Sequence, residues 1–555
     1  MEKISGEKNG IYSVKNVEGE ICEDSESILK TCREYYKNLY TKEEENIELQ
    51  NFFIRGLDKT LSEEDRAMLD QPITEDELHE ALKSLNGGKS PGHSGLTVEF
   101  YVKFWDEIKE YLINSLDETK IEEELSEMQK RGAIRISFKK DDRSNLDCYR
   151  PITLLEVDLK ILAKVLSMRL NKVLSKLINL EQKCVSGRHI TDNIHLVQDI
   201  IDLINANDEE AAFLLFDMQK AFDRLSHTFL IKVLEGFGFG EGFIKWVKIL
   251  LRDVKSFVRV NGFETEEFDI QRGVRQGCCL SPLLFVLASE TLAIAINNNP
   301  RIKGYKLGEY DFKLGQFADD LISCVTDTES IYKLFDVMEK FGKATNSKLN
   351  KTKTKGLWVG KWTNRQDKPN NLKWYNDKVE LLGTFVGNRK TKSQYGQLCN
   401  INFEDIKDKV KSKINYWKGN NLSLKGKVRV VNGFALSKLY YRSEVVDISV
   451  EKVKEIEALL LDFIWNGKKI NRVDRNVLLM GYESGGLQLY DTIERMKIMR
   501  VRWLRFLLSL KESDARRLVV DKLIGSYRQI KGLKIIHHDI ERKKLLLRVF
   551  SMKKQ

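Results

Sequence analysis

Two short apolar runs in this chain end at, or enclose, acidic residues, and this arrangement limits the possible folds more than any other feature. Residues 211–216, AAFLLF, stop abruptly at Asp217, a pattern that favours a buried strand, although the run alone also allows a helix. Residues 314–326, LGQFADDLISCVT, place Asp319 and Asp320 between two apolar halves, as expected for two strands joined by a tight turn. Carboxylates at the ends of buried strands are costly unless they are paired, hydrogen-bonded or bound to a metal.

The chemistry of these three acids depends on whether the two segments are neighbours in the fold. If they are, Asp217 and the Asp319–Asp320 pair converge, although 102 residues separate Asp217 from Asp319. Carboxylates combined with water are ligands suited to Mg²⁺. Two such ions about 4 Å apart activate an attacking hydroxyl and stabilise a leaving pyrophosphate, which is nucleotidyl-transfer chemistry. The alternative is that each acid is an ordinary turn or surface residue.

The charge of the chain is divided unevenly along its length. The 555 residues contain 92 Lys+Arg and 82 Asp+Glu, a net charge of +10, yet residues 1–80 alone hold 10 basic and 21 acidic side chains. The first 80 residues therefore carry −11 and the remainder +21. A basic body favours a polyanionic partner, nucleic acid first, although a solvated lysine-rich surface would have the same composition. No stretch approaches the roughly 18 consecutive apolar residues of a membrane span, so no membrane partner is expected.

Apolar periodicity elsewhere predicts long helices mixed with short strands, which is typical of the α+β class. Residues 158–178 carry leucines at helical spacing and predict a long amphipathic helix whose apolar stripe is core. Residues 87–92, GGKSPG, predict a loop and do not match the phosphate-binding P-loop pattern. Lysine-rich helices are predicted over 404–417 and 451–466, and a small helical extension over 1–80.

Three motifs around the acidic residues resemble those of one family. The run FDMQKAFDRLSH (216–227) has an Asp after a strand and an aromatic residue five positions later. RGVRQGCCLSPLLF (272–285) and FADD (317–320) follow in order. Together they resemble the palm motifs of the reverse transcriptases of non-LTR (LINE-type) retrotransposons, with Phe317 where Tyr is the commoner residue. Further segments that resemble the family's flanking, fingers, palm and thumb motifs, in collinear order, lie at 10–41, 86–96, 147–166, 181–194, 347–357, 381–387, 463–468 and 485–491.

This resemblance covers nearly the whole chain and implies a right-hand polymerase. The implied parts are an acidic helical N-terminal extension, fingers, a palm with an antiparallel sheet, a helical thumb and a basic C-terminal helical segment, at residues 1–80, 81–210, 211–390, 391–510 and 511–555. The implied enzyme is an RNA-directed DNA polymerase that extends a DNA 3′-OH primer on an RNA template with dNTPs. It would use two Mg²⁺ ions, for which Mn²⁺ could substitute. The resemblance also implies a nuclear location with a cytoplasmic ribonucleoprotein stage.

The family roles transfer to positions of this chain. Asp217 and Asp319 would bind both metal ions, Asp320 would complete the acidic centre, and the Met218 carbonyl would be an extra ligand. Phe222 would lie under the sugar of the incoming nucleotide and exclude a 2′-OH, whereas the residue by itself, without its fixed distance from Asp217, reads as a core aromatic.

Other family roles concern the nucleotide and its leaving group. Lys353 would protonate the departing pyrophosphate, although Lys351 and Lys355 are close alternatives. Trp417 and Trp465, in the helices of the implied thumb, read as core residues. The residues that the resemblance assigns to contact with the nucleotide or the nascent base pair are Gln276, Gly277, Arg150 and Lys140.

The chain departs from the family pattern in several places. Cys279 stands where the family usually has Pro, and Ser94 where it usually has Asp, but neither change removes an implied metal ligand. No endonuclease domain or zinc knuckle is recognisable, so nicking of target DNA is expected from a parent chain or a separate protein. Two alternatives therefore stay open: a decayed or domesticated copy that binds RNA without polymerising, and an intron-encoded maturase, whose motif spacing and thumb fit less well.

Overall fold

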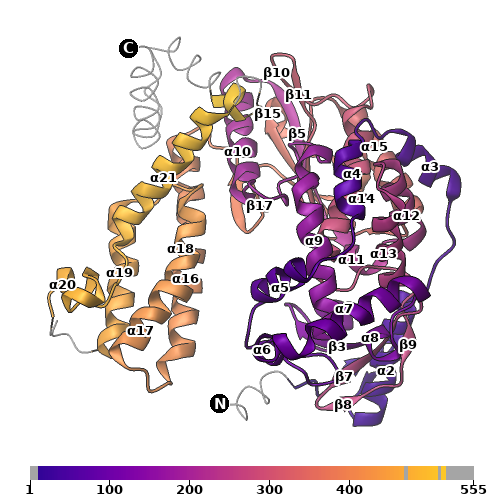
Figure 1. The fold of residues 1–555 in the computed structure, drawn as a ribbon. Coiled ribbons are helices and arrows are strands. Elements are labelled where there is room, and N and C mark those ends of the chain that lie inside the picture. The colour runs from indigo at the N-terminus through magenta and orange to yellow at the C-terminus, as the bar shows by residue number, and fades with distance from the viewer. Residues whose placement is uncertain (1–9, 468–472, 511–513, 515, 521–555) are drawn as a thin grey trace.

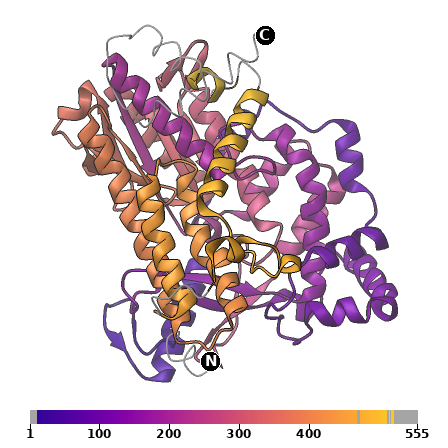
Figure 2. The ribbon, with the colours of Figure 1, turned by 90° about the vertical axis from the view of Figure 1, so that its left-hand side faces the viewer.

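A computed structural model of the chain describes residues 10–467, 473–510, 514 and 516–520, which form two lobes (Figure 1 and Figure 2). The larger lobe contains the β-sheets and extends to the hairpin of β17 (Lys378–Leu381) and β18 (Thr384–Gly387). The smaller lobe is helical and begins with α16 (Lys392–Lys418). The two lobes stand side by side in Figure 1 and meet at the top, where α21 (Thr492–Ser509) reaches α10 (Ile190–Asn207).

The central sheet of the larger lobe has five strands. Its strand order is β12 (Leu314–Phe317), β13 (Asp320–Val325), β5 (Glu210–Phe216), β15 (Lys355–Gly360) and β16 (Lys373–Tyr375). Every neighbouring pair is antiparallel except β15 and β16. The predicted strand over 211–216 and the predicted hairpin over 314–326 are both confirmed, and they are direct neighbours because β13 pairs with β5.

Strand β5 is covered by helices on both faces. Leu214 belongs to the main core together with α14 (Ser281–Asn297) and α15 (Thr328–Thr345), whereas Phe213 belongs to a second core with α10. Successive residues of a strand point to opposite faces of the sheet. A strand covered on both faces must be apolar at every position, which is the physical reason for the uninterrupted run AAFLLF.

A second sheet lies in the larger lobe beside the central one. Its strand order is β4 (Tyr149–Leu154), β3 (Arg131–Phe138), β7 (Lys255–Val260) and β8 (Phe263–Glu264), and β9 (Phe268–Asp269) also pairs with β7. Strands β3 and β4 are antiparallel, with Ser137 opposite Arg150, and β3 and β7 are parallel. Strand β4 also contacts the loop that follows β9, where the Thr153 N–H donates to the Gln276 carbonyl.

The helix predicted over 158–178 is confirmed as α9 (Val157–Leu177), and its leucine stripe is buried in the main core. One charged residue of this helix, Arg169, is also buried. Its guanidinium donates to both oxygens of Glu77, at 2.7 and 2.6 Å, and to three backbone carbonyls between residues 69 and 72. These bonds attach the N-terminal helices to α9, because a buried guanidinium needs all of its partners.

The N-terminal residues form the predicted helices and one small hairpin that the sequence did not indicate, made of β1 (Val14–Lys15) and β2 (Ile21–Cys22). Tyr36 and Phe53 from this region are fully buried in the same core as α9 and α14. The acidic segment is therefore an integral part of the larger lobe. Its helices are α2 (Ser25–Tyr40), α3 (Ile47–Arg55), α4 (Glu63–Asp70) and α5 (Glu75–Ser84).

The helical lobe has a core of its own, separate from the cores of the sheets. The predicted helices over 404–417 and 451–466 correspond to parts of α16 and α19, and Trp417 and Trp465 pack against this core as predicted. The elements of this lobe after α16 are α17 (Leu424–Val430), the π-helix η4 (Val431–Ala435), α18 (Leu436–Ser443), α19 (Val450–Trp465), α20 (Arg475–Leu479), η5 (Tyr482–Ser484) and α21.

The return of the chain to the larger lobe is made by aromatic and ionic contacts. Trp503 of α21 stacks on His195 of α10 with ring centroids 4.4 Å apart. Beyond α21, the Arg516 guanidinium donates to Asp192 at 2.7 Å. The basic helical segment predicted over 511–555 lies outside the described residues, apart from 514 and 516–520.

The remaining elements connect these parts, and the predicted loop over 87–92 is confirmed. Within the described ranges, no helix combines the length and the apolar character that crossing a bilayer requires. The elements not yet named are α6 (Val98–Lys103), α7 (Trp105–Glu122), α8 (Glu127–Lys130), η1 (Leu146–Cys148), β6 (Met218–Gln219), α11 (Ala221–Arg224), α12 (His227–Gly236), α13 (Glu241–Leu251), β10 (Tyr305–Leu307), β11 (Tyr310–Phe312), β14 (Lys348–Leu349), η2 (Lys361–Asn364) and η3 (Pro369–Asn371).

Candidate active site

The three acidic residues singled out in the sequence lie at one edge of the central sheet. Asp217 directly follows β5, Asp319 occupies the two-residue turn between β12 and β13, and Asp320 begins β13. Phe216 pairs with Leu321, so the next position in register sets Asp217 opposite Asp320. Strand pairing therefore brings together Asp217 and Asp320, which are 103 positions apart in the chain.

The electrostatics of this edge favour a bound cation. Burial raises the pKa of Asp319, and the charge of Asp217 raises it further. Although Asp320 lies at the surface, desolvation by the surrounding protein, followed by the charges of Asp319 and Asp217, raises the pKa of Asp320 to about 6. In the described part of the chain, none of the three carboxylates has an ion-pair partner. This excess negative charge suits a divalent cation with oxygen ligands.

The side chains are close enough for the charge of Asp217 to raise the pKa of Asp319 and of Asp320, but they do not form a closed ligand set. Among the described residues, no three His, Cys, Asp or Glu side chains are grouped tightly enough to hold a metal ion. The donor type still fits Mg²⁺, which keeps several waters and needs only one or two carboxylates from the protein.

The backbone of Asp217 is held by the turn that contains the predicted acid Lys353. The Asn350 N–H donates to the Asp217 carbonyl at 2.8 Å, and the Asp217 N–H donates to Thr354 Oγ1 at 3.4 Å. In the antiparallel ladder of β6 and β14, the next pair is Leu349 and Met218. The backbone groups of these two residues do not bond to each other, so the Met218 carbonyl faces away from β14. The side chain of Lys353 is exposed.

Phe222 lies in the short helix α11, close after Asp217. Its ring is half-buried and stacks on Phe285 of α14, with centroids 4.4 Å apart and an interplanar angle of 26°. Its carbonyl accepts a hydrogen bond from the Val274 N–H at 2.7 Å. Stacking on Phe285 thus holds the ring, and the hydrogen bond holds the backbone of Phe222, while part of the ring remains accessible.

Gln276 and Gly277 contact protein groups in this structure. Gln276 Nε2 donates to both carboxylate oxygens of Asp223, at 3.0 and 2.9 Å. The Gln276 carbonyl accepts from the Thr153 N–H of β4 at 2.6 Å. Gly277 has a φ of +130°, and a Cβ at this position would lie 2.3 Å from the Thr153 carbonyl oxygen. The glycine therefore allows a close approach to β4, whereas the expectation was a close approach to the nucleotide.

Replacement of Gly277 with alanine is expected to destabilise the larger lobe by at least about 2 kcal/mol, because the strained φ and the contact with Thr153 add. The matched control is Gly262→Ala, since Gly262 also has a positive φ of +93° but has nothing within 4 Å of its Cβ position. Thermal unfolding of both variants measures the difference. Equal melting temperatures for the two variants would contradict the close approach to β4.

Asp223 is a buried residue beside Gln276 that the sequence reading did not single out. It is fully buried and accepts a hydrogen bond from the Tyr40 hydroxyl at 2.9 Å as well as the two from Gln276. Burial raises the pKa of Asp223 to about 6. Because Tyr40 ends α2, the N-terminal segment reaches the floor of the site. The only signal in the sequence was the position of Asp223 directly after Phe222.

Two basic residues act on the carboxylates from the second sheet. The charges of Lys139 and Arg150 both lower the pKa of Asp319 against the larger effect of burial. Lys139 follows β3 and Arg150 lies on β4. Because these two strands pair with each other, both residues approach the turn that contains Asp319. Lys140, the residue expected from the sequence, and its neighbour Lys139 are both exposed, and the charge of Lys139 lowers the pKa of Asp319 and of Asp320.

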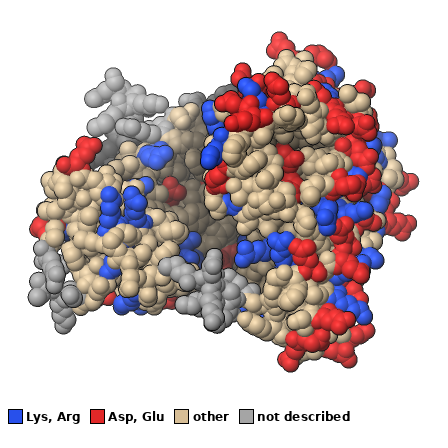
Figure 3. All heavy atoms as spheres, turned by 60° about the horizontal axis from the view of Figure 1, so that its bottom comes forward, with Lys and Arg blue, Asp and Glu red and all other residues tan. Residues whose placement is uncertain are grey.

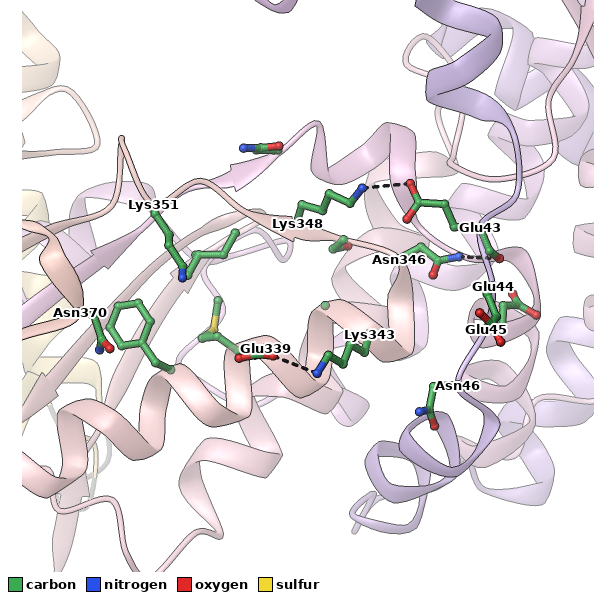
Figure 4. A pocket seen from close by; sticks show the side chains of 16 residues that line it. Glu43, Glu44, Glu45, Asn46, Glu339, Lys343, Asn346, Lys348, Lys351 and Asn370 are labelled. Carbon is green, nitrogen blue, oxygen red and sulfur yellow. Dashed lines mark hydrogen bonds and ion pairs between the residues drawn. The ribbon is translucent and has the colours of Figure 1, made fainter.

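A cavity of about 820 Å³ opens beside β6 and β14 (Figure 4). Its wall combines the acidic residues Glu43–Glu45 with lysines near β14 and α15. Lys348 pairs with Glu43 at 3.2 Å, and Lys343 pairs with Glu339 at 2.9 Å. None of the three aspartates lines it, so this cavity is separate from the candidate active site.

The surface between the two lobes is hollowed (Figure 3). In this view Asp and Glu gather on the outer side of the larger lobe, while Lys and Arg occur on the helical lobe and beside the hollow. A hollow with basic residues at its sides suits a phosphate backbone.

Comparison with known proteins is consistent with the α+β fold. Residues 138–386, which include the three aspartates, match the family of reverse transcriptases (RNA-dependent DNA polymerases). These residues therefore carry a reverse transcriptase domain, and the relatives of the chain support a reverse transcriptase of the non-LTR retrotransposon kind. Enzymes of this class copy RNA templates from DNA primers and generally use divalent metals such as Mg²⁺.

The relatives are proteins of transposable elements. The chain is 31% identical over 493 residues to the transposon TX1 uncharacterized 149 kDa protein of Xenopus laevis, an alignment that covers 88% of the chain and 37% of that protein. It is 27% identical over 266 residues to the Pol polyprotein of retrotransposable element R2 from Popillia japonica, covering 45% of the chain and 34% of that protein. The chain thus spans about a third of the length of these relatives.

Proposed function

We propose that this chain extends a DNA 3′-OH primer on an RNA template by two-metal nucleotidyl transfer. The observation that carries the proposal is the edge of the central sheet, where Asp217, Asp319 and Asp320 meet without an ion-pair partner among the described residues. The substrates are an RNA template, a DNA primer and dNTPs.

The two lobes support a right-hand arrangement with fingers at 81–210, palm at 211–390 and thumb at 391–510. The five-stranded sheet falls within the proposed palm, and the separate helical core falls within the proposed thumb. Residues 1–80 act as an extension packed into the main core. The template–primer duplex occupies the hollow of Figure 3, held by contacts to its phosphates.

In the proposed reaction Asp217 and Asp319 hold the metal ions, and Asp320 and the Met218 carbonyl complete the site. Bound Mg²⁺ supplies activation of the primer hydroxyl and stabilisation of the leaving pyrophosphate. The role of the Met218 carbonyl as a metal ligand is supported by its orientation, since it does not accept a hydrogen bond from β14. Lys353 protonates the pyrophosphate as it leaves.

The nucleotide lies between the turn of Asp319 and the second sheet in this proposal. Arg150 binds the triphosphate, since a guanidinium suits bidentate phosphate contact, and Lys139 or Lys140 assists it. Phe222 lies under the sugar, supported by Phe285. Gln276 contacts the nascent base pair, and Gly277 keeps its loop against β4.

The primer-extension test uses purified chain with poly(rA), oligo(dT), dTTP and Mg²⁺, beside the Asp319→Asn variant. Incorporation that disappears in the variant supports the proposal. A folded chain that binds RNA but incorporates nothing is the result expected of a decayed copy and would overturn it.

The departures from the family pattern do not favour that decayed copy. Ser94 donates hydrogen bonds to Glu156, through its N–H at 3.0 Å and through its hydroxyl. Cys279 is a free thiol. Neither residue has a described hydrogen bond or ion pair with the three aspartates. We further propose that target nicking comes from a parent chain or a separate endonuclease, and that the protein acts in the nucleus after a cytoplasmic ribonucleoprotein stage.

The metal-free protein is expected to be stabilised by Asp320→Asn at neutral pH. The folded pKa of Asp320, about 6, lies above the usual 3.8, so the folded state holds the proton more tightly. The ionised carboxylate therefore lowers the free energy of unfolding above pH 6, and this effect disappears as the pH falls toward 4. Thermal unfolding in a chelator from pH 4 to 8 should show the variant melting above wild type only at the higher pH. A variant that melts below wild type at pH 7.5 would refute the assignment.

A further inference from the structure

The turn that presents Asp319 is held by a side chain from outside the central sheet. Gln182 lies between α9 and α10 and is fully buried. Its Oε1 accepts a hydrogen bond from the Ala318 N–H at 2.9 Å, and its Nε2 donates to the Ala318 carbonyl at 3.4 Å. One carboxamide thus binds both backbone groups of the residue directly before Asp319.

The conformation of Ala318 explains why such a support is needed. Ala318 has a φ of +53°, in the left-handed region that a residue with a Cβ adopts only at a cost in free energy. A two-residue β-hairpin turn requires positive φ values, and glycine or asparagine usually supplies them. Here alanine occupies the position, so contacts from the surrounding structure must stabilise it.

Gln182 itself is fixed in place by the chain around it. Residue 182 bridges residue 316 of β12 in parallel orientation. The Lys183 N–H donates to the Gln316 carbonyl at 2.8 Å, and the Gln316 N–H donates to the Glu181 carbonyl at 2.9 Å. Oε1 of Gln182 also accepts from the Cys184 N–H at 3.0 Å. The carboxamide is therefore a rigid clamp whose position is tied to the hairpin it holds.

We infer that Gln182 is a positioning residue for the metal-binding turn: it keeps Ala318 left-handed and thereby sets where the carboxylates of Asp319 and Asp320 lie. The inference rests on the proposed function, because it concerns the same carboxylates. Gln182 does not touch the reacting atoms, so it acts through the turn. Loss of the clamp lets Ala318 relax to a negative φ, which moves the neighbouring Asp319.

A buried amide can also be merely structural, and the chain offers a matched control. Gln198 of α10 clamps one backbone residue in the same way: its Nε2 donates to the Gly387 carbonyl at 3.0 Å, and its Oε1 accepts from the Gly387 N–H at 3.0 Å. Gly387 lies on β18, outside the acidic hairpin. Gln182→Ala and Gln198→Ala therefore each remove two hydrogen bonds to one backbone residue. Each also removes one further bond, from the Cys184 N–H in the first case and to Asp202 in the second, but only the first variant touches the turn.

The experiment measures Mg²⁺ binding and primer extension in four variants: Gln182→Ala, Gln198→Ala, Ala318→Gly and the double variant Gln182→Ala/Ala318→Gly. Binding is the Mg²⁺ concentration that gives half of the metal-induced rise in melting temperature. We expect Gln182→Ala to need roughly tenfold more Mg²⁺ and to lower kcat by about a hundredfold, because small misplacements of reacting groups have effects of this size. The KM for dTTP should change little.

Rescue separates positioning from a general structural role. Glycine adopts positive φ without the cost that a Cβ imposes, so Ala318→Gly should restore at least part of the Mg²⁺ affinity and of kcat to Gln182→Ala. Gln198→Ala should lower the melting temperature without changing the Mg²⁺ requirement. Equal Mg²⁺ requirements for the two glutamine variants, or no gain in the double variant, would overturn the inference. If wild type incorporates no dTTP, the proposed function fails, and the Mg²⁺ melting measurement still decides whether Gln182 positions the turn.

Discussion

Replacing Asp217 with asparagine is expected to lower kcat for primer extension by at least about a thousandfold. Loss of a metal-binding carboxylate removes several kcal/mol of transition-state stabilisation, and each 1.4 kcal/mol corresponds to a factor of about ten. The change is nearly isosteric, and the backbone bonds of Asp217 to Asn350 and Thr354 do not involve its side chain. The fold should therefore survive, and single-turnover extension measures the loss.

The control for this prediction is Asp269→Asn. Asp269 also ends a strand, β9, and is exposed, but it lies in the second sheet. It should retain activity within about twofold of wild type. An Asp217→Asn protein that remains folded and extends primers at more than a tenth of the wild-type rate would exclude a metal-binding role for this residue.

Replacing Phe222 with valine is expected to reduce discrimination against ribonucleotides by about a hundredfold. The ring is half-buried on Phe285, so its position under the proposed sugar site is well defined. Valine removes the part of the ring that would meet a 2′-OH, and steric exclusion in a shaped pocket has effects of 10- to 200-fold. The ratio of kcat/KM for dTTP to that for UTP measures the change.

The matched variant for this position is Phe222→Tyr, which keeps the ring and its stacking on Phe285. It should keep the sugar discrimination of wild type. If valine at position 222 leaves the ratio unchanged while primer extension persists, Phe222 is a core aromatic and not a steric gate. Melting temperatures of both variants separate loss of packing from loss of selectivity.

Tyr40 links the N-terminal segment to the proposed nucleotide site beside Gln276. Its hydroxyl and Gln276 share the carboxylate of Asp223, and Glu43 nearby pairs with Arg224, Arg272 and Lys348. The acidic N-terminal segment is therefore connected to Gln276 through the carboxylate of Asp223. A negative local charge is compatible with this role, because several acids of the segment, Glu43, Asp65, Glu75 and Glu77, pair with cations further along the chain.

Local sequence patterns determined the elements that carry the site. The run AAFLLF favoured a buried strand, and FADD within an apolar hairpin favoured a tight acidic turn, because strand burial and turn chemistry depend on near neighbours in the chain. The leucine spacing of α9 specified a core helix for the same reason. The three aspartates could thus be selected before any contact was known.

Only the tertiary structure decided how these residues and their supports are arranged. The register of β13 on β5 sets Asp320 opposite Asp217, and pairing across 103 residues has no local signal. The same holds for the effect of the Lys139 charge on the pKa of Asp319 and for the approach of Gly277 to Thr153. The orientation of a side chain depends on the groups that folding places around it. A buried amide such as Gln182 therefore reveals its partner, Ala318, only in the folded chain.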